Sequence, residues 1–195
     1  MLIERFEKRG LQAGRIDFER NDVVIEAGSN TDWFFDPRGT AKLQNVPSVT
    51  MSIDKPAFAL QAKVAVDFGS RFDGGTIFVQ AREDAWAKIA FEYSPRHIPT
   101  IVSVVTRGVS DDCDGPSFQA EAVYLRLSAQ DGAFALHFSD TGKDWRFLRW
   151  FSLAHGTGPL TIGLSAQSPL GNGCRVHFSE IRLSHEPIAD LRDGS

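Results

Sequence analysis

The strongest constraint on the fold is an alternation of side-chain character at every second residue. In the segment 86–93, one set of alternating residues could fill a core: Ala87, Ile89, Phe91 and Tyr93. The other set combines an aromatic ring with two opposite charges: Trp86, Lys88, Ala90 and Glu92. A period of two is typical of a β-strand with one buried face. No long segment shows the 3.6-residue period of a helix, so the chain is predicted to be all-β.

The same alternation recurs in short segments that are separated by turn residues. Besides 86–93, the predicted strands are 21–28, 48–53, 58–68, 74–82, 100–108, 160–169 and 174–183, with a β-meander over 122–153. This gives roughly eleven to thirteen strands at spacings of ~8–12 residues, which is typical of sandwiches and barrels. Strands do not alternate with helical segments, which argues against a parallel α/β sheet. We therefore predict an antiparallel β-sandwich of two packed sheets.

Length and composition fit a single globular domain. The 195 residues, with 42% hydrophobic residues, predict one domain over 1–195, with a core at about 5–185 and a loosely ordered C-terminal tail. A net charge of −4 argues against a nucleic-acid partner and against electrostatic attachment to membranes. The N-terminal sequence lacks the apolar region of a secretory signal, and no apolar stretch approaches ~18 residues. We therefore expect a cytoplasmic protein.

The order of several motifs resembles the DUF1349 family. The relevant segments are SNTDWFFDPRG (29–39), AREDAWAKIAFEY (81–93), SVVTRGVSD (103–111), the meander at 123–149 and IGLSAQSP (162–169). The resemblance covers about residues 5–185, with one departure: Trp33 stands one position earlier than the family pattern implies. The resemblance implies a concanavalin A-like lectin/glucanase jelly roll. It also implies similarity to fungal enolase-regulator proteins and to the β-sandwich of some bacterial xylosidases.

Polar residues opposite the predicted core positions are the candidate ligand-binding residues. The resemblance implies that they line a groove on the concave sheet, although alternating polar residues are also typical of a solvated face. Trp86 would supply a flat surface for a sugar ring, and the polar groups would bind hydroxyls. The candidate set is Gln80, Trp86, Lys88, Glu92, Ser103, Arg126, His137 and Gln167.

Glu92 and Lys88 are the candidate catalytic residues. Glycosidases normally use two carboxylates, whereas Glu92 has Ala90 and Lys88 at the positions where related glucanases carry a second glutamate. The acidic segment 106–118 is interpreted as a solvated loop rather than a Ca²⁺ site. The five histidines and two cysteines show no spacing typical of a metal site, and the cysteines do not form a disulfide framework. No metal and no cofactor are therefore predicted.

Three functions remain open from the sequence. The first is binding of a carbohydrate or another polar metabolite, a saccharide or sugar-derived ligand, in the concave groove. The second is a protein-interaction module with a protein partner, which regulates a metabolic enzyme, as the fungal relatives' name suggests. The third is a glycan-active enzyme that uses Glu92 and Lys88 for acid–base chemistry.

Overall fold

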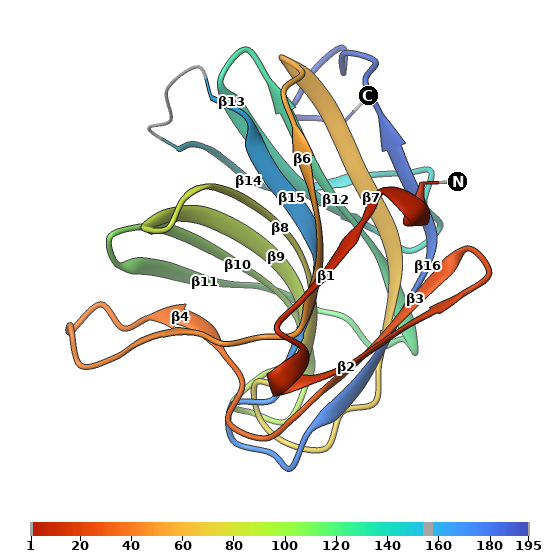
Figure 1. The fold of residues 1–195 in the computed structure, drawn as a ribbon. Coiled ribbons are helices and arrows are strands. Elements are labelled where there is room, and N and C mark those ends of the chain that lie inside the picture. The colour runs from red at the N-terminus through yellow and green to blue at the C-terminus, as the bar shows by residue number, and fades with distance from the viewer. Residues whose placement is uncertain (1, 154–157, 195) are drawn as a thin grey trace.

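The fold is a sandwich of two antiparallel sheets, seen in a computed structural model that describes residues 2–153 and 158–194 (Figure 1). In spatial order, sheet A contains β1 (Glu7–Arg9), β6 (Ser48–Ile53), β15 (Leu160–Gln167), β8 (Gly74–Arg82), β9 (Ala85–Tyr93), β10 (Pro99–Arg107) and β11 (Ser110–Ser117). Sheet B contains β14 (Arg146–Ser152), β13 (Ala133–Ser139), β12 (Ala122–Gln130), β7 (Ala57–Val66), β16 (Cys174–Ser184), β3 (Asp22–Ala27) and β2 (Gly14–Glu19). The predicted two-sheet antiparallel β-sandwich is confirmed.

Three small elements complete the described chain. The 3₁₀ turns η1 (Ile3–Arg5) and η2 (Leu11–Ala13) flank β1, and a short hairpin is formed by β4 (Trp33–Phe35) and β5 (Lys42–Gln44). In the described residues, no helix has the length and apolar character needed to cross a membrane.

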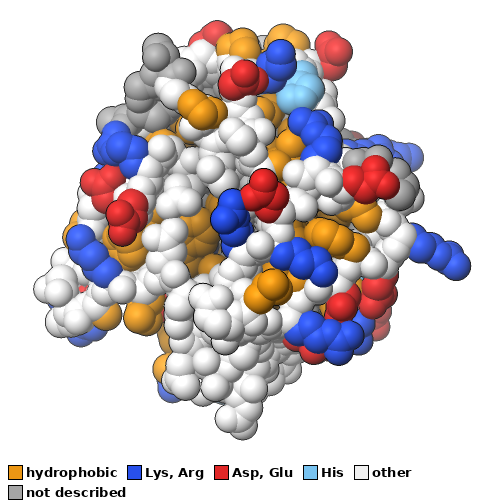
Figure 2. Space-filling model, viewed as in Figure 1, with side chains coloured by type: hydrophobic (Ala, Val, Ile, Leu, Met, Phe, Trp, Pro, Cys, Tyr) orange, Lys and Arg blue, Asp and Glu red, His pale blue; other side chains and the backbone are white. Residues whose placement is uncertain are grey.

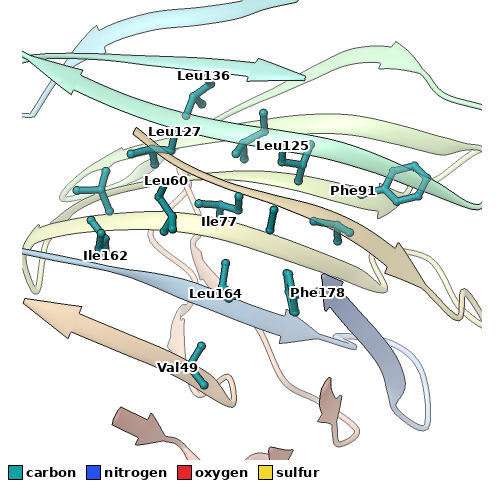
Figure 3. Close-up of a cluster of buried hydrophobic side chains, with 14 of the residues drawn as sticks. Val49, Leu60, Ile77, Phe91, Leu125, Leu127, Leu136, Ile162, Leu164 and Phe178 are labelled. Atoms are coloured by element: carbon teal, nitrogen blue, oxygen red, sulfur yellow. The ribbon is translucent and has the colours of Figure 1, made fainter. Parts of the chain in front are cut away.

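The main core fills the space between the two sheets. The longer central strands contribute alternate side chains to it, as the alternation in the sequence predicts. Figure 3 shows this packing for Ile77, Ile162 and Leu164 of sheet A and for Leu60 and Leu125 of sheet B, all of them fully buried. Full burial of one such side chain stabilises the fold by about 1.5–3 kcal/mol. This core holds the two sheets together.

The register of sheet A decides which side chains share a face. Lys88 of β9 lies opposite Phe78 of β8 and Val104 of β10, whereas Ile89 lies opposite Ser103. Directly opposed residues point to the same side of a sheet. Lys88 and Val104 therefore face outward, away from sheet B, and Ser103 faces the interior of the sandwich with Ile89.

The β4–β5 hairpin covers part of the outer face of sheet A. Trp33 and Phe35 of β4 pack against Trp86, with ring centroids 4.9 and 5.7 Å away, and Trp33 also contacts Phe78. These side chains form a second, smaller apolar cluster that is separate from the main core. Figure 1 shows β4 on the side of β8–β11 that faces away from sheet B. The hairpin thus turns a sheet surface into a partly enclosed site.

The structure has more strands than the roughly eleven to thirteen that were predicted, with sixteen in the described residues. The predicted acidic loop is in fact the edge strand β11, which runs from Ser110 to Ser117 and pairs with β10. The prediction missed it because exposed residues occupy both faces of this edge strand and leave no apolar alternation. β4 and β5 were missed because each has only three residues.

Candidate functional site

The centre of the site is a chain of polar contacts between β9 and β15. The ammonium of Lys88 donates hydrogen bonds to the Trp33 carbonyl oxygen (2.8 Å) and to Gln167 Oε1 (2.7 Å). Gln167 Nε2 donates to Glu92 Oε2 (3.3 Å) and to the Phe72 carbonyl oxygen (3.2 Å). The amide of Gln167 therefore links the lysine to the glutamate.

Burial makes these contacts energetically significant. Lys88 is 2% exposed and Glu92 is 7% exposed, and charged groups this deep in a protein are costly unless they are paired or hydrogen-bonded. Burial raises the pKa of Glu92 to about 8; Lys88 opposes this shift, and Asp112, Asp32 and Asp114 reinforce it. The Glu92 carboxyl is thus largely protonated at neutral pH.

A hollow of about 300 Å³ opens directly onto this polar chain, and we call it the Lys88–Glu92 pocket. Its volume lies at the lower end of the range for small-molecule sites. Acidic, aromatic and other apolar side chains complete its wall. Its lining residues are Asp32, Phe34, Phe72, Lys88, Glu92, Val104, Asp112, Gln167 and Pro169.

A buried hydrogen-bond network positions three of the segments that border the pocket. Asp73 accepts a hydrogen bond from the Ser168 hydroxyl (2.6 Å) and two more from the Gly69 and Ser70 amides. The Ser168 amide in turn donates to the Thr31 hydroxyl (2.9 Å). The network connects the loop before β8, the end of β15 and the segment that leads into β4, so it fixes the neighbours of Phe72, Gln167 and Asp32.

Phe72 has an unusual backbone conformation at the pocket wall. Its φ of 69° lies in the left-handed region, which is uncommon for a bulky residue. In this conformation its carbonyl oxygen accepts the Gln167 amide while its ring lines the pocket. Strained residues of this kind are often found at ligand sites, where the surrounding structure holds them in place.

The predicted role of Trp86 as an exposed sugar platform is wrong. Trp86 does lie on the outer face of β9, but it is fully buried beneath Trp33 and Phe35. Its indole Nε1 has no hydrogen-bond partner among the described residues. Trp86 therefore anchors the hairpin, and the rings that reach the pocket are those of Phe34 and Phe72.

Three predicted binding residues lie outside the pocket. Ser103 points into the sandwich and contacts Arg149 of β14 (3.4 Å). Arg126 of β12 and His137 of β13 are directly opposed on the outer face of sheet B, which is the other side of the molecule. The sequence indicated outward-facing residues correctly there, but it did not indicate which sheet carries them.

The C-terminal segment covers Arg126 and His137. Arg126 donates to the Gly194 carbonyl oxygen (2.6 Å) and lies over the Trp145 ring, and His137 Nε2 bonds the Leu191 carbonyl oxygen (2.9 Å). The predicted loose tail thus makes specific contacts at residues 191–194. Burial, assisted by Arg126, lowers the pKa of His137 to about 4, so this imidazole is neutral at pH 7.

Gln80 lies on the correct face but in a different hollow. It points outward from β8 opposite Trp86 and lines a depression of about 550 Å³ together with Trp33 and Phe78. Neither of these two aromatic residues lines the Lys88–Glu92 pocket. Of the eight predicted binding residues, the structure therefore brings together Lys88, Glu92 and Gln167.

Alternation along the predicted strands did not reveal the remaining polar wall of the pocket. Asp112 faces outward from β11, because it is opposite Val104 in the strand register. Asp32 precedes the hairpin that was not predicted as strand. A usable signal was present in the sequence: Trp33 and Phe35 alternate with Asp32 and Phe34, which places two aromatic anchors on one side and pocket residues on the other.

The other titratable groups do not form a metal site in the described part of the chain. There, no three His, Cys, Asp or Glu side chains come close enough to share one ion. His155 lies outside the described residues. Asp111, one of the acidic residues of β11, pairs with Arg149 (2.8 Å), whereas Arg107 donates to the Ser152 carbonyl oxygen. On the face shown in Figure 2, acidic and basic side chains are interspersed.

The two face-to-face antiparallel sheets give the chain a β-sandwich fold that is similar to the fold of lectin-like solved structures. The chain belongs to the DUF1349 family, described as a protein of unknown function, whose pattern matches residues 15–186. No curated protein matches the chain.

Solved structures show the same fold in proteins of different kinds. A functionally unknown protein from Saccharomyces cerevisiae has a TM-score of 0.84 and 22% identity, with 93% of this chain and 97% of that chain covered. The GH43 BlXynB protein from Bacillus licheniformis has a TM-score of 0.69 and 16% identity, with 85% of this chain but 33% of that chain covered. A legume lectin-like domain from Entamoeba histolytica has a TM-score of 0.62 and 14% identity, with 95% and 92% covered. At these identities the similarity defines the fold only.

Proposed function

We propose that the chain binds a small carbohydrate or a related polar metabolite in the Lys88–Glu92 pocket. The observation that carries this proposal is the buried Lys88–Gln167–Glu92 chain, which opens into a hollow flanked by two aromatic rings. A saccharide site needs this combination of fixed polar groups and a flat apolar surface. The lectin-like and glycosidase-like folds of the structural neighbours are consistent with such a ligand.

Lys88 has a donor available for this ligand. An ammonium carries three N–H groups, and the described residues accept two of them, at Trp33 and Gln167. The remaining N–H can bind a hydroxyl oxygen, while the Glu92 carboxyl can accept from or donate to a second hydroxyl. Because both side chains are held rigidly, little conformational entropy is lost on binding.

A thermal-shift screen tests this proposal. The purified chain would be heated with mono- and oligosaccharides of different charge; xylo-oligosaccharides belong in the set because one structural neighbour is a xylan β-1,4-xylosidase. A ligand that binds the native state raises the melting temperature. The shift should disappear in Glu92→Gln and persist in Asp54→Asn, which changes an exposed carboxylate outside the pocket. A shift of equal size in Glu92→Gln would place the ligand elsewhere.

A second candidate function is catalysis on a glycan, and one property of the same pocket supports it. A carboxyl with a pKa raised to about 8 is suited to act as a general acid, and Asp32 and Asp112 supply further carboxyl groups in the same pocket. Release of reducing ends from an oligosaccharide that shifts the melting temperature would test this activity. Turnover in the wild type that is lost in both Glu92→Gln and Asp112→Asn would support it.

The protein-interaction alternative stays a prediction, as does the cytoplasmic location. Most of the large apolar side chains that are exposed in the described residues stand singly on the surface: Leu11, Phe18, Leu43, Val109 and Leu170. The exceptions are Phe147 and Trp150, which both belong to β14. Arg192 lies over both of those rings. Isolated apolar residues on a surface carry no argument for a partner.

A further inference from the structure

Acidic groups outnumber basic groups around the Lys88–Glu92 pocket. Three carboxyl groups line it, from Asp32, Glu92 and Asp112, and Lys88 is the only lysine or arginine among its described lining residues. Asp114 lies near the same face of β11, opposite Val102. Its charge acts on both Glu92 and Asp112. The pocket therefore holds three acidic side chains against one basic side chain.

Both hydrogen bonds of Lys88 to the described residues go to uncharged partners. Its ammonium bonds the Trp33 carbonyl and the Gln167 amide oxygen, and within the described residues it forms no ion pair with a carboxylate at 4.0 Å or less. Its charge lowers the pKa values of Glu92 and Asp112, but burial has the larger effect and both values remain raised. Both carboxyl groups would be stabilised by a further positive charge.

The Glu92 carboxyl has acceptor capacity that the protein does not fill. Although Glu92 is more than nine-tenths buried, the described residues give it one hydrogen bond, from Gln167 to Oε2 at 3.3 Å. A carboxylate has about four lone-pair sites and normally accepts several hydrogen bonds when it is buried. Once it is ionised, Glu92 can therefore accept a further hydrogen bond from the pocket side.

The aromatic residues of the pocket favour the same kind of donor. Phe34 and Phe72 line the hollow together with the carboxyl groups. The faces of aromatic rings attract cations, and carboxylates beside aromatic rings are a recurrent arrangement for ammonium recognition. An anionic group, by contrast, would meet three acidic side chains and one lysine that already donates to two neutral partners.

We propose that the ligand of this pocket carries a protonated amine, as amino sugars do, and that the amine lies against Glu92 and Asp112. This proposal rests on the proposed saccharide-binding function and specifies its ligand class. The hydroxyl groups of such a sugar accept the remaining Lys88 N–H, and its ammonium supplies a further donor to Glu92.

Binding of an amine has a proton-linked consequence. Glu92 faces Lys88 on its own strand, Asp112 and Asp114 on β11, Asp32 before β4 and the uncharged Gln167 amide. In the free protein, burial and the acidic neighbours raise the pKa of Glu92 to about 8, against the effect of Lys88. A bound ammonium stabilises the carboxylate, so Glu92 releases its proton to solvent as the ligand binds.

Calorimetric titration of the full chain with four related sugars tests the proposal. Glucosamine, glucose, N-acetylglucosamine and glucuronate share a ring and differ in charge. At about pH 7, glucosamine should bind at least about tenfold more tightly than glucose, and glucuronate should bind least. Titrations in two buffers with different ionisation enthalpies should show proton release with glucosamine beyond any proton taken up by its amine.

Two variants make the test specific. Asp112→Asn removes one acidic group from the pocket with little change of shape, and should weaken glucosamine binding about fivefold more than it weakens glucose binding. Asp54→Asn should change neither. Glucose binding as tightly as glucosamine would overturn the amine proposal and leave the proposed saccharide function intact. Absence of binding by all four sugars and by the oligosaccharides of the earlier screen would overturn both.

Discussion

At the scale of single residues, the site depends on one side chain that accepts a hydrogen bond at one atom and donates hydrogen bonds from another. The Gln167 amide presents its oxygen to Lys88 and its nitrogen to Glu92 and to the Phe72 carbonyl. The positions of these partners fix the orientation of the amide, since an exchange of O and N would place an NH₂ against an ammonium. The glutamate at the end of this chain is buried, and burial raises its pKa to about 8, against the effect of Lys88.

Glu92→Gln should make stability less dependent on pH. The native pKa of Glu92 is raised to about 8 from an ordinary 4.5, so between these values the unfolded chain releases a proton that the native chain retains. Stability contributed at this site therefore falls as pH rises from 4.5 to 8. The variant should be the more stable protein at pH 8, on the order of 1 kcal/mol or more.

Urea denaturation at several values between pH 5 and pH 8 measures this effect. Asp54→Asn serves as the matched control, because Asp54 is an exposed carboxylate that does not line a described pocket. If the wild type and Glu92→Gln show the same slope of stability against pH, Glu92 is not protonated in the native state.

Trp86→Ala should destabilise the protein rather than only remove a ligand contact. Trp86 is fully buried and contacts Trp33 and Phe35, so truncation leaves a cavity with a cost of about 3–5 kcal/mol. Trp86→Phe should cost less because it retains a ring. Thermal unfolding of both variants measures the difference, and a Trp86→Ala variant as stable as the wild type would contradict this account of the hairpin anchor.

At the scale of elements, the pocket depends on how a short hairpin is attached to a sheet. Besides its two aromatic anchors, the hairpin has a buried polar contact: the Phe35 amide donates to Ser110 Oγ (2.9 Å), which also bonds Thr106 Oγ1 (2.8 Å). Ser110 is the first residue of the edge strand β11, which also carries Asp112. The hairpin segment and β11, which both contribute residues to the pocket wall, are thus joined by the Ser110 hydroxyl group.

Ser110→Ala should loosen the hairpin. The buried Phe35 amide would lose its acceptor, which costs about 1–3 kcal/mol when no water replaces it. Amide hydrogen exchange at Phe35 should accelerate relative to the strands of the main core, and overall stability should fall. Ser117→Ala is the control on the same strand, because Ser117 is exposed and its side-chain hydroxyl has no hydrogen bond among the described residues. Equal Phe35 exchange in both variants would show that Ser110 does not hold the hairpin.

The sequence predicted those elements in which one face is apolar and the other is polar. Strands β7, β8 and β9 follow this rule, and so Lys88 and Glu92 were correctly placed on an outer face. β10 is almost uniformly apolar and β-branched, so the sequence did not define its faces and Ser103 was assigned to the wrong one. The pairing of strands across the sandwich also has no local signal, which explains why Arg126 and His137 were grouped with residues of the other sheet.

At the scale of the whole molecule, one core spans both sheets and the two outer faces are covered differently. The hairpin covers sheet A, and the C-terminal segment covers part of sheet B through Arg126, His137 and Gln130. The main core includes residues from both sheets, so we expect the sandwich to unfold as one cooperative unit. We expect the hairpin and the C-terminal segment each to contribute less to stability than the main core does, and independently of one another.

A chain that ends at Ala189 should remain folded with lower stability. Removal of the following residues exposes Arg126 and His137 and breaks their bonds to Gly194 and Leu191, with a cost of roughly 1–2 kcal/mol. For a chain of this length the melting temperature should fall by roughly 2–8 °C. A truncated chain that melts at the wild-type temperature would show that the segment adds no stability.

The titration of His137 provides an independent test of whether the C-terminal segment buries this side chain. Its native pKa is lowered to about 4 from an ordinary 6.5, so stability contributed by the neutral imidazole is present above pH 6.5 and is lost as pH falls through 4. In the truncated chain the imidazole is solvated, and its pKa should rise toward the ordinary value. Proton NMR of the histidine ring would follow this change, and an unchanged pKa would contradict the proposed burial by the tail.

The division between sandwich and cover has a consequence for how such proteins diverge. Asp32 and Phe34 belong to the hairpin segment, Phe72 and Pro169 lie in loops and Asp112 is on an edge strand, so much of the pocket wall lies outside the main core. Loops and edges tolerate substitution and changes of length far better than packed interiors do. Selection can therefore remodel the wall while the sandwich is conserved. Two descendants of one ancestral chain can keep the same core and still recognise unrelated molecules.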